Sequence, residues 1–279
     1  MPDKIDPPHA TGAAAKTVEA HSEPHDLVFY APFVQRVWIA LEEKKLAYQY
    51  VEINPYLKEG HFLAINPKGL VPAIEYKGKL DASLGRCRVS IPAHEALPEG
   101  IAILAHQALY ESLVLLEFLD DAFPGHSLRP ADPHEAGVVR LASQQVSNVT
   151  IPAFYKYVQA QSADDQRASG AAFVKSLKDV YQQWFIPGAT WARGSQFGHL
   201  DCVLAPWIAR FGILERHRAF RSDDLGAEFK AYAARVLERP SVKATSSEND
   251  KYDSVYARYL TDTAESEVAK ATRKGEWLK

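Results

Sequence analysis

The sequence predicts an α/β domain in the first part of the chain and an all-helical domain after it. Residues 27–30, 48–53 and 71–76 have the apolar or alternating pattern of strands, and residues 34–44 have helical spacing. From residue 108 onward the apolar residues recur at helical spacing. A strand–helix–strand unit, one further strand and then helices alone is typical of an α/β domain followed by an all-α domain.

Each N-terminal element has a local cause. Residues 27–30 form a short, continuously apolar segment, as expected of a buried strand. In the following helix Val34 and Val37 share one face. Pro32 suits the first turn because its missing N–H would have no intrahelical partner. Residues 48–53 alternate with period two. The remaining elements predicted in this part are a short helix within residues 56–65, a turn at 66–69 and a strand at 71–76.

The two domains are expected at residues 26–122 and 132–279. Between them Pro124, Gly125 and Pro130 cluster, which is typical of a connecting loop. Residues 1–25 are rich in proline, alanine, histidine and charge without an apolar period, so we expect a disordered tail. Helices of the second domain are predicted at residues 133–149, 151–157, 169–184, 200–210, 227–237 and 251–269.

Composition excludes several classes of function. Lys and Arg number 32 against 35 Asp and Glu, without a basic block, which argues against a nucleic-acid partner. Cys87 and Cys202 lie far apart without metal-ligand spacing, so we expect neither a disulfide framework nor a structural metal. The chain has no apolar run of the ~18–20 residues that span a membrane, and no secretory signal pattern. We therefore expect a cytoplasmic protein without a membrane partner.

Four motifs follow one another in a family-specific order. They are YAPF at residues 30–33, NPKGLVP at 66–72, ES at 111–112 and LDCVLAPW at 200–207. The set resembles the cytosolic glutathione transferases, most closely the omega class and its fungal relatives, over residues 26–273. This resemblance implies a thioredoxin-like N-terminal domain, an all-α glutathione-transferase C-terminal domain, glutathione as co-substrate, no metal, and the homodimer usual in the family.

The resemblance also implies a glutathione site. Pro72 would be a cis proline that turns the Val71 backbone toward the cysteinyl part of glutathione. The alternative is an ordinary trans proline at a strand edge. Glu111 and Ser112 start a helix, where anions are favoured, and would hold the γ-glutamyl ammonium and carboxylate. A simple helix cap is the alternative there. The implied glutathione-binding residues are Phe33, Lys58, Val71, Pro72, Glu111 and Ser112, with a solvated loop lysine as the alternative for Lys58.

Ala31 departs from the family pattern. Omega members carry a nucleophilic cysteine at this position, whereas the methyl group of alanine can neither form a mixed disulfide nor hydrogen-bond a thiolate. We therefore expect only a backbone role for Ala31, with the thiol pKa lowered by N–H groups at the helix start. Tyr30 is the alternative hydroxyl donor. Because side chains alternate along a strand, packing is the favoured role for Tyr30.

A second departure separates the third strand from the Glu111–Ser112 helix. Residues 80–107 intervene where the family has a short hairpin, and removing them restores a typical family sequence. One interpretation is an atypical surface insertion beside the glutathione site. The other is an in-frame intron retained in the gene sequence. In either case Cys87 is a poor candidate for the nucleophile.

Aromatic side chains in the helical domain indicate a hydrophobic substrate side. Trp207, by its family position, and Tyr155 are the candidates, with ordinary core packing as the alternative for such residues. We expect a glutathione transferase that acts on an aromatic or quinone-like electrophile, in fungal secondary metabolism or detoxification. The alternative is a non-catalytic glutathione- or ligand-binding protein with the same fold, which Ala31 favours.

Overall fold

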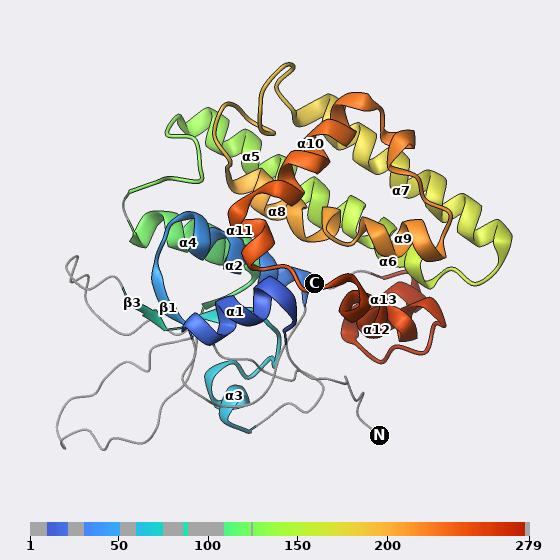
Figure 1. Ribbon diagram of the computed structural model, residues 1–279, viewed down its shortest axis with the longest axis horizontal. Helices are drawn as coiled ribbons and strands as arrows, with labels where there is room; N and C mark the ends of the chain where they lie inside the picture. Colours follow the sequence, from blue (N-terminus) through green and yellow to red (C-terminus); the bar gives the residue numbers. More distant parts are fainter. Residues whose placement is uncertain are drawn as a thin grey trace.

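The computed structural model describes residues 10–21, 31–50, 60–74, 86–88, 109–123 and 125–276. Strands occur before residue 111, and the chain from there on is helical (Figure 1). This order confirms the α/β domain followed by a helical domain that the sequence predicts.

Short strands pair in two places. β1 (Ala47–Gln49) runs parallel to β3 (Arg86–Arg88), with Ala47 opposite Arg86. β2 (Ala73–Ile74) runs antiparallel to β4 (Leu109–Tyr110). Since β3 lies within residues 80–107, the segment absent from the family pattern contributes a strand beside β1. β4 follows that segment and reaches the expected pairing position beside β2.

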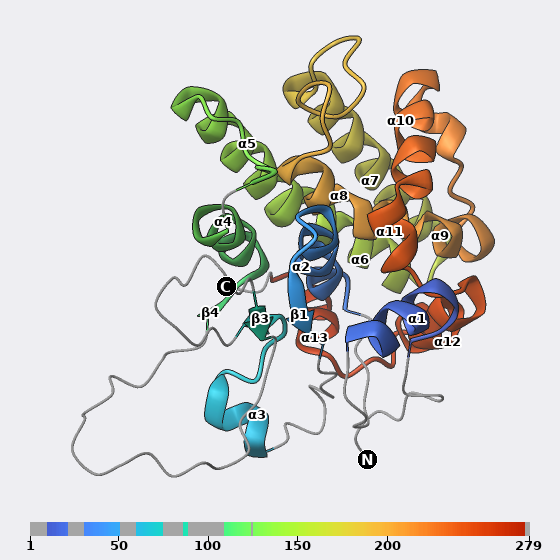
Figure 2. The same ribbon diagram turned by 60° about the vertical axis from the view of Figure 1, so that its left-hand side comes forward.

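A central helix positions the functional site. α2 (Pro32–Glu43) packs against both α4 (Ser112–Ala122) and α8 (His199–Ile208), so it joins the two domains (Figure 2). The five side chains from Val37 to Leu41 are at most 6% exposed. Such an all-round apolar stretch requires a helix that is buried on every side. α3 (Gly60–Ile65) lies on the far side of β1 and β3 from α4 (Figure 2).

The helical domain agrees with the sequence to within a few residues at most boundaries. Its longest helix begins at Ala163 rather than at residue 169, because the Ser162 hydroxyl accepts from the Asp165 N–H at 3.0 Å and caps it. The elements are α5 (Pro133–Gln145), the π-helical turn η1 (Val146–Thr150), α6 (Ile151–Gln159), α7 (Ala163–Trp184), α8, α9 (Phe211–His217), the 3₁₀ turn η2 (Ser222–Leu225), α10 (Ala227–Glu238), α11 (Pro240–Ala244), α12 (Asn249–Leu260) and α13 (Glu267–Lys274).

The disordered tail expected at residues 1–25 was wrong for residues 12–21. These residues form α1 (Gly12–His21), which packs on α11 and β1. Ala14 is 1% exposed, and the Thr17 hydroxyl donates to the Ala244 carbonyl at 2.6 Å. The apolar stripe of α1 consists of small residues, so its pattern is weak in the sequence although the helix is anchored by tertiary contacts.

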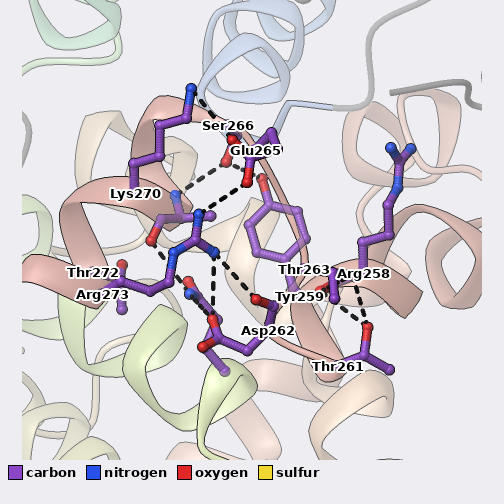
Figure 3. Close-up of polar contacts among 12 residues, drawn as sticks. Arg258, Tyr259, Thr261, Asp262, Thr263, Glu265, Ser266, Lys270, Thr272 and Arg273 are labelled. Atoms are coloured by element: carbon purple, nitrogen blue, oxygen red, sulfur yellow. Dashed lines mark hydrogen bonds and ion pairs between the residues drawn. The ribbon is translucent and has the colours of Figure 1, made fainter. Parts of the chain in front are cut away.

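The single helix predicted at residues 251–269 is also corrected. The chain turns between α12 and α13, where Asp262 has a positive φ of 54°. Figure 3 shows Asp262 facing Arg273 of α13, with their side chains 3.4 Å apart. The Ser266 hydroxyl then caps α13 and accepts from the Tyr259 hydroxyl at 2.7 Å. Backbone groups at the turn are satisfied by side chains: Ser266 Oγ accepts from the Ala269 N–H at 3.0 Å, and Arg273 Nη1 donates to the Asp262 carbonyl at 3.3 Å.

Candidate functional site

The N-terminus of α2 forms one wall of the site. Ala31 caps the helix with extended backbone angles (φ −67°, ψ 126°), and its carbonyl accepts from the Val34 N–H at 3.0 Å. Pro32 follows in the first turn, as predicted. The helix dipole gives this end a partial positive charge. The Ala31 side chain supplies neither a nucleophile nor a hydroxyl there.

Two sequence motifs meet across the β2–β4 ladder. Ala73 lies opposite Tyr110 in this antiparallel pair. Extending the same register by one residue puts Pro72 across from Glu111. The Val71–Pro72 peptide bond is cis, as the family resemblance implied, and not the trans bond of the alternative. The fold therefore brings residues 71–72 and 111–112 to the same edge of the sheet.

Glu111 has an unusual backbone. Its φ of 72° with ψ of 113° lies in a region that residues other than glycine rarely adopt, and such strain clusters at ligand sites. The side chain is exposed and makes no hydrogen bond or ion pair with the residues that the structure describes. An exposed carboxylate thus stands at the start of α4, beside the Val71–Pro72 edge.

A buried arginine fixes the position of the Ser112 side chain. Ser112 is only 6% exposed, and its Oγ accepts a hydrogen bond from Arg36 Nη1 at 3.1 Å. The same guanidinium donates from Nη2 to Ser147 Oγ at 3.1 Å and from Nε to the Val203 carbonyl at 3.2 Å. Arg36 therefore connects α2 with α4, η1 and α8.

Arg36 carries its charge in an apolar setting. It is 1% exposed, and burial lowers its pKa to about 9, which leaves it protonated at neutral pH. Its guanidinium lies over the rings of Trp207 at 4.6 Å and Phe33 at 5.3 Å, a cation–π arrangement. Sequence reasoning missed this residue. The signal that could have revealed it is a lone arginine within the apolar stretch of α2.

The predicted aromatic residues partly converge on this point. Phe33 and Trp207 pack edge to face, with ring centroids 5.1 Å apart. Trp207 is 3% exposed, and its Nε1 has no hydrogen-bond partner among the described residues. Tyr155 is 3% exposed and packs against Tyr259 at 5.7 Å. Burial raises the pKa of Tyr155 well above its usual range, so it is a neutral hydroxyl close to Arg36.

Several candidates do not join this cluster. Tyr30 and Lys58 lie outside the described residues. Cys87 lies in β3 opposite Tyr48, but its side chain is not among those described. Cys202 is completely buried in α8, and burial raises its thiol pKa well above the usual range, so it is an unreactive core residue.

The described part of the chain shows neither a metal site nor a membrane span. It holds no group of three or more His, Cys, Asp or Glu side chains that could bind a metal ion. None of its helices combines the length and the hydropathy needed to cross a membrane.

Comparison with known proteins gives the family. Residues 30–122 match the glutathione S-transferase N-terminal domain. The crystal structure of glutathione transferase Omega 3C from Trametes versicolor is 41% identical, with a TM-score of 0.74, over 92% of this chain and 100% of that one. The chain belongs to the glutathione transferase family. This membership confirms the resemblance read from the four motifs and the thioredoxin-like character of the first domain.

Omega-class proteins recur among the relatives of this glutathione transferase. Omega 1C from Trametes versicolor is 27% identical, with a TM-score of 0.61, over 83% of this chain and 94% of that one. Glutathione S-transferase omega-1 from Sus scrofa is 25% identical over 77% of this chain and 76% of its own.

Proposed function

We propose that the protein binds glutathione at the edge formed by residues 71–72 and 111–112 and adds its sulfur to a hydrophobic electrophile. The observation that carries the proposal is the β2–β4 register, which sets Pro72 across from Glu111 at the start of α4. Peptide-like ligands bind well to such exposed backbone edges, and helix starts favour carboxylates.

Each implied residue has a role in this proposal. The Val71 backbone pairs with the cysteinyl part of glutathione, the Ser112 hydroxyl donates to the γ-glutamyl carboxylate, and the exposed Glu111 carboxylate binds the ammonium. Phe33 and Lys58 serve the rest of the tripeptide. Trp207 and Tyr155 belong to the hydrophobic substrate side, and Tyr30 remains the alternative hydroxyl donor.

Ala31 decides the chemistry. Without a cysteine at position 31 the site forms no disulfide with glutathione, so the glutathione thiol itself must become the nucleophile. The positive end of α2 lowers the thiol pKa, and the proton leaves to water. The thiolate sulfur then attacks the electrophilic carbon, and a carbon–sulfur bond forms. On an aryl chloride the carbon–chlorine bond breaks and chloride leaves; on a quinone the electron pair of the carbon–carbon double bond moves to the carbonyl oxygen, and water protonates the adduct.

The substrate side favours a flat, apolar molecule. The edge-to-face pair of Phe33 and Trp207 at the N-terminus of α2 supports an aromatic or quinone-like electrophile, because aromatic rings bind such molecules by stacking. A role in detoxification or secondary metabolism, a cytoplasmic location and a homodimer complete the proposal. Val114 in α4 and Leu141 in α5, which are 52% and 56% exposed, are two apolar side chains that a homodimer could cover.

The test combines glutathione binding with turnover. Calorimetry should show saturable glutathione binding, and 1-chloro-2,4-dinitrobenzene or a benzoquinone should be conjugated in the presence of glutathione. Ser112→Ala should weaken glutathione binding, whereas Ser143→Ala, a buried serine one turn before η1, should not. Binding without conjugation of either electrophile favours the alternative, a non-catalytic ligand-binding protein. Absence of glutathione binding refutes both.

A further inference from the structure

The buried charge of Arg36 has no counter-ion among the residues that the structure describes. Its three hydrogen-bond partners, Ser112 Oγ, Ser147 Oγ and the Val203 carbonyl, are all neutral. Among the described residues no carboxylate forms an ion pair with it. Buried charges in proteins are normally paired, because removing a lone charge from water is costly. A cation held this way next to a binding edge indicates that the ligand supplies the missing negative charge.

The hydrogen bond to Ser112 also fixes which way the serine hydroxyl acts. A guanidinium can only donate, so Arg36 Nη1 occupies an acceptor lone pair of Ser112 Oγ. The single hydroxyl proton is then left for another acceptor. Ser112 is the first residue of α4, where the helix dipole favours an anion. The serine is thereby prepared to donate to a carboxylate.

The second serine extends this arrangement into the helical domain. Ser147 lies in the π-helical turn η1, a type of irregularity that is frequent at functional sites. Its Oγ accepts from Nη2 of the same guanidinium whose Nη1 donates to Ser112. A change at Ser147 can therefore reach the binding edge through Arg36.

We propose that Arg36 is a positioning residue for the γ-glutamyl carboxylate of glutathione, holding Ser112 as a hydrogen-bond donor and being neutralised by that carboxylate. The inference rests on the proposed glutathione site and adds to it a residue that does not touch the ligand. Because Ser147 belongs to the helical domain, full affinity for glutathione at the α/β domain requires the helical domain as well.

The test uses two ligands that differ only in the γ-glutamyl group. Calorimetry on the full chain compares glutathione with cysteinylglycine. Arg36→Met should weaken glutathione binding about 10- to 100-fold, as expected for a charge-assisted hydrogen bond, and leave cysteinylglycine binding unchanged. Arg36→Lys should recover part of the loss. The losses caused by Arg36→Met and Ser112→Ala should be less than additive in the double variant.

Matched variants keep the test decisive if Arg36→Met does not fold. Ser147→Ala should weaken glutathione binding several-fold, and Ser143→Ala should not, since the Ser143 hydroxyl bonds to the Val139 carbonyl of its own helix at 2.8 Å. Equal losses for both ligands, or additive effects of the Arg36 and Ser112 changes, overturn the positioning role. Failure of the unaltered protein to bind glutathione overturns the proposed function instead.

Discussion

His199 is expected to make stability fall as the pH drops below about 6.5. It is the first residue of α8 and is 2% exposed, and its Nδ1 has no hydrogen-bond partner in the part of the chain that the structure describes. Burial lowers its pKa from 6.5 to about 4; nearby Glu117 and Asp120 oppose this shift, whereas Arg36 and Arg129 reinforce it. The folded state therefore holds the neutral ring and resists protonation.

The sign and size follow from linkage. Because the folded pKa lies below the unfolded one, the contribution of the neutral ring is complete above pH 6.5 and is lost as the pH falls toward 4. The full shift corresponds to ~3 kcal/mol, and the loss between about pH 7 and pH 5 is ~2 kcal/mol.

Urea unfolding provides the assay. The free energy of unfolding of the unaltered protein should fall by ~2 kcal/mol more than that of His199→Asn between about pH 7 and pH 5. The comparison uses the pH slope, so a constant loss of stability in the variant does not matter. His134→Asn, at a histidine whose side chain is 84% exposed, should keep the slope of the unaltered protein. Parallel slopes for His199→Asn and the unaltered protein would refute the reasoning.

Three further changes test the structure. Lys44 and Asp120 form an ion pair at 2.8 Å, and both side chains are 2% exposed. Lys44→Met removes one partner and should lower the free energy of urea unfolding by ~3 kcal/mol. An unchanged value would contradict a buried pair. Ala31→Cys should form a mixed disulfide with oxidised glutathione, releasing one glutathione, and mass spectrometry would detect the adduct; no adduct would argue against a binding site at this helix start. Gly170→Ala would put a Cβ 2.8 Å from the Tyr157 ring and should cost ~1–3 kcal/mol in the same unfolding assay. Gly137→Ala, in open space, should be neutral or stabilising, and equal effects at the two glycines would rule out the steric explanation.

The sequence predicts those parts of the site that short sequence patterns mark. Pro32 marks a helix start, and the Asn66–Gly69 turn with Pro72 marks a strand entry, so their chemistry shows in neighbouring residues. The pairing of Pro72 with Glu111 was available only through the family resemblance, since no local pattern joins positions separated by residues 80–107.

What the sequence could not predict depends on tertiary contacts. Arg36 appears in the sequence as a charge on an apolar helix, and its three partners come from distant parts of the chain. α1 has too small an apolar stripe to form a helix by itself, and becomes ordered only against α11 and β1. The break at Asp262 depends on side chains of α13 that reach back to it.

α1 acts as a clasp across the two domains. Near the middle of α1 the Thr17 hydroxyl donates to the last residue of α11. At the C-terminal end of α1 the His21 carbonyl accepts from the Tyr50 N–H at 2.9 Å, and the His21 ring stacks on Tyr48 with centroids 4.0 Å apart. A shortened protein that starts near residue 30, where the family match begins, would lose this clasp although every glutathione-site residue remained. Expression of the protein for binding studies should therefore retain the chain from at least Ala10.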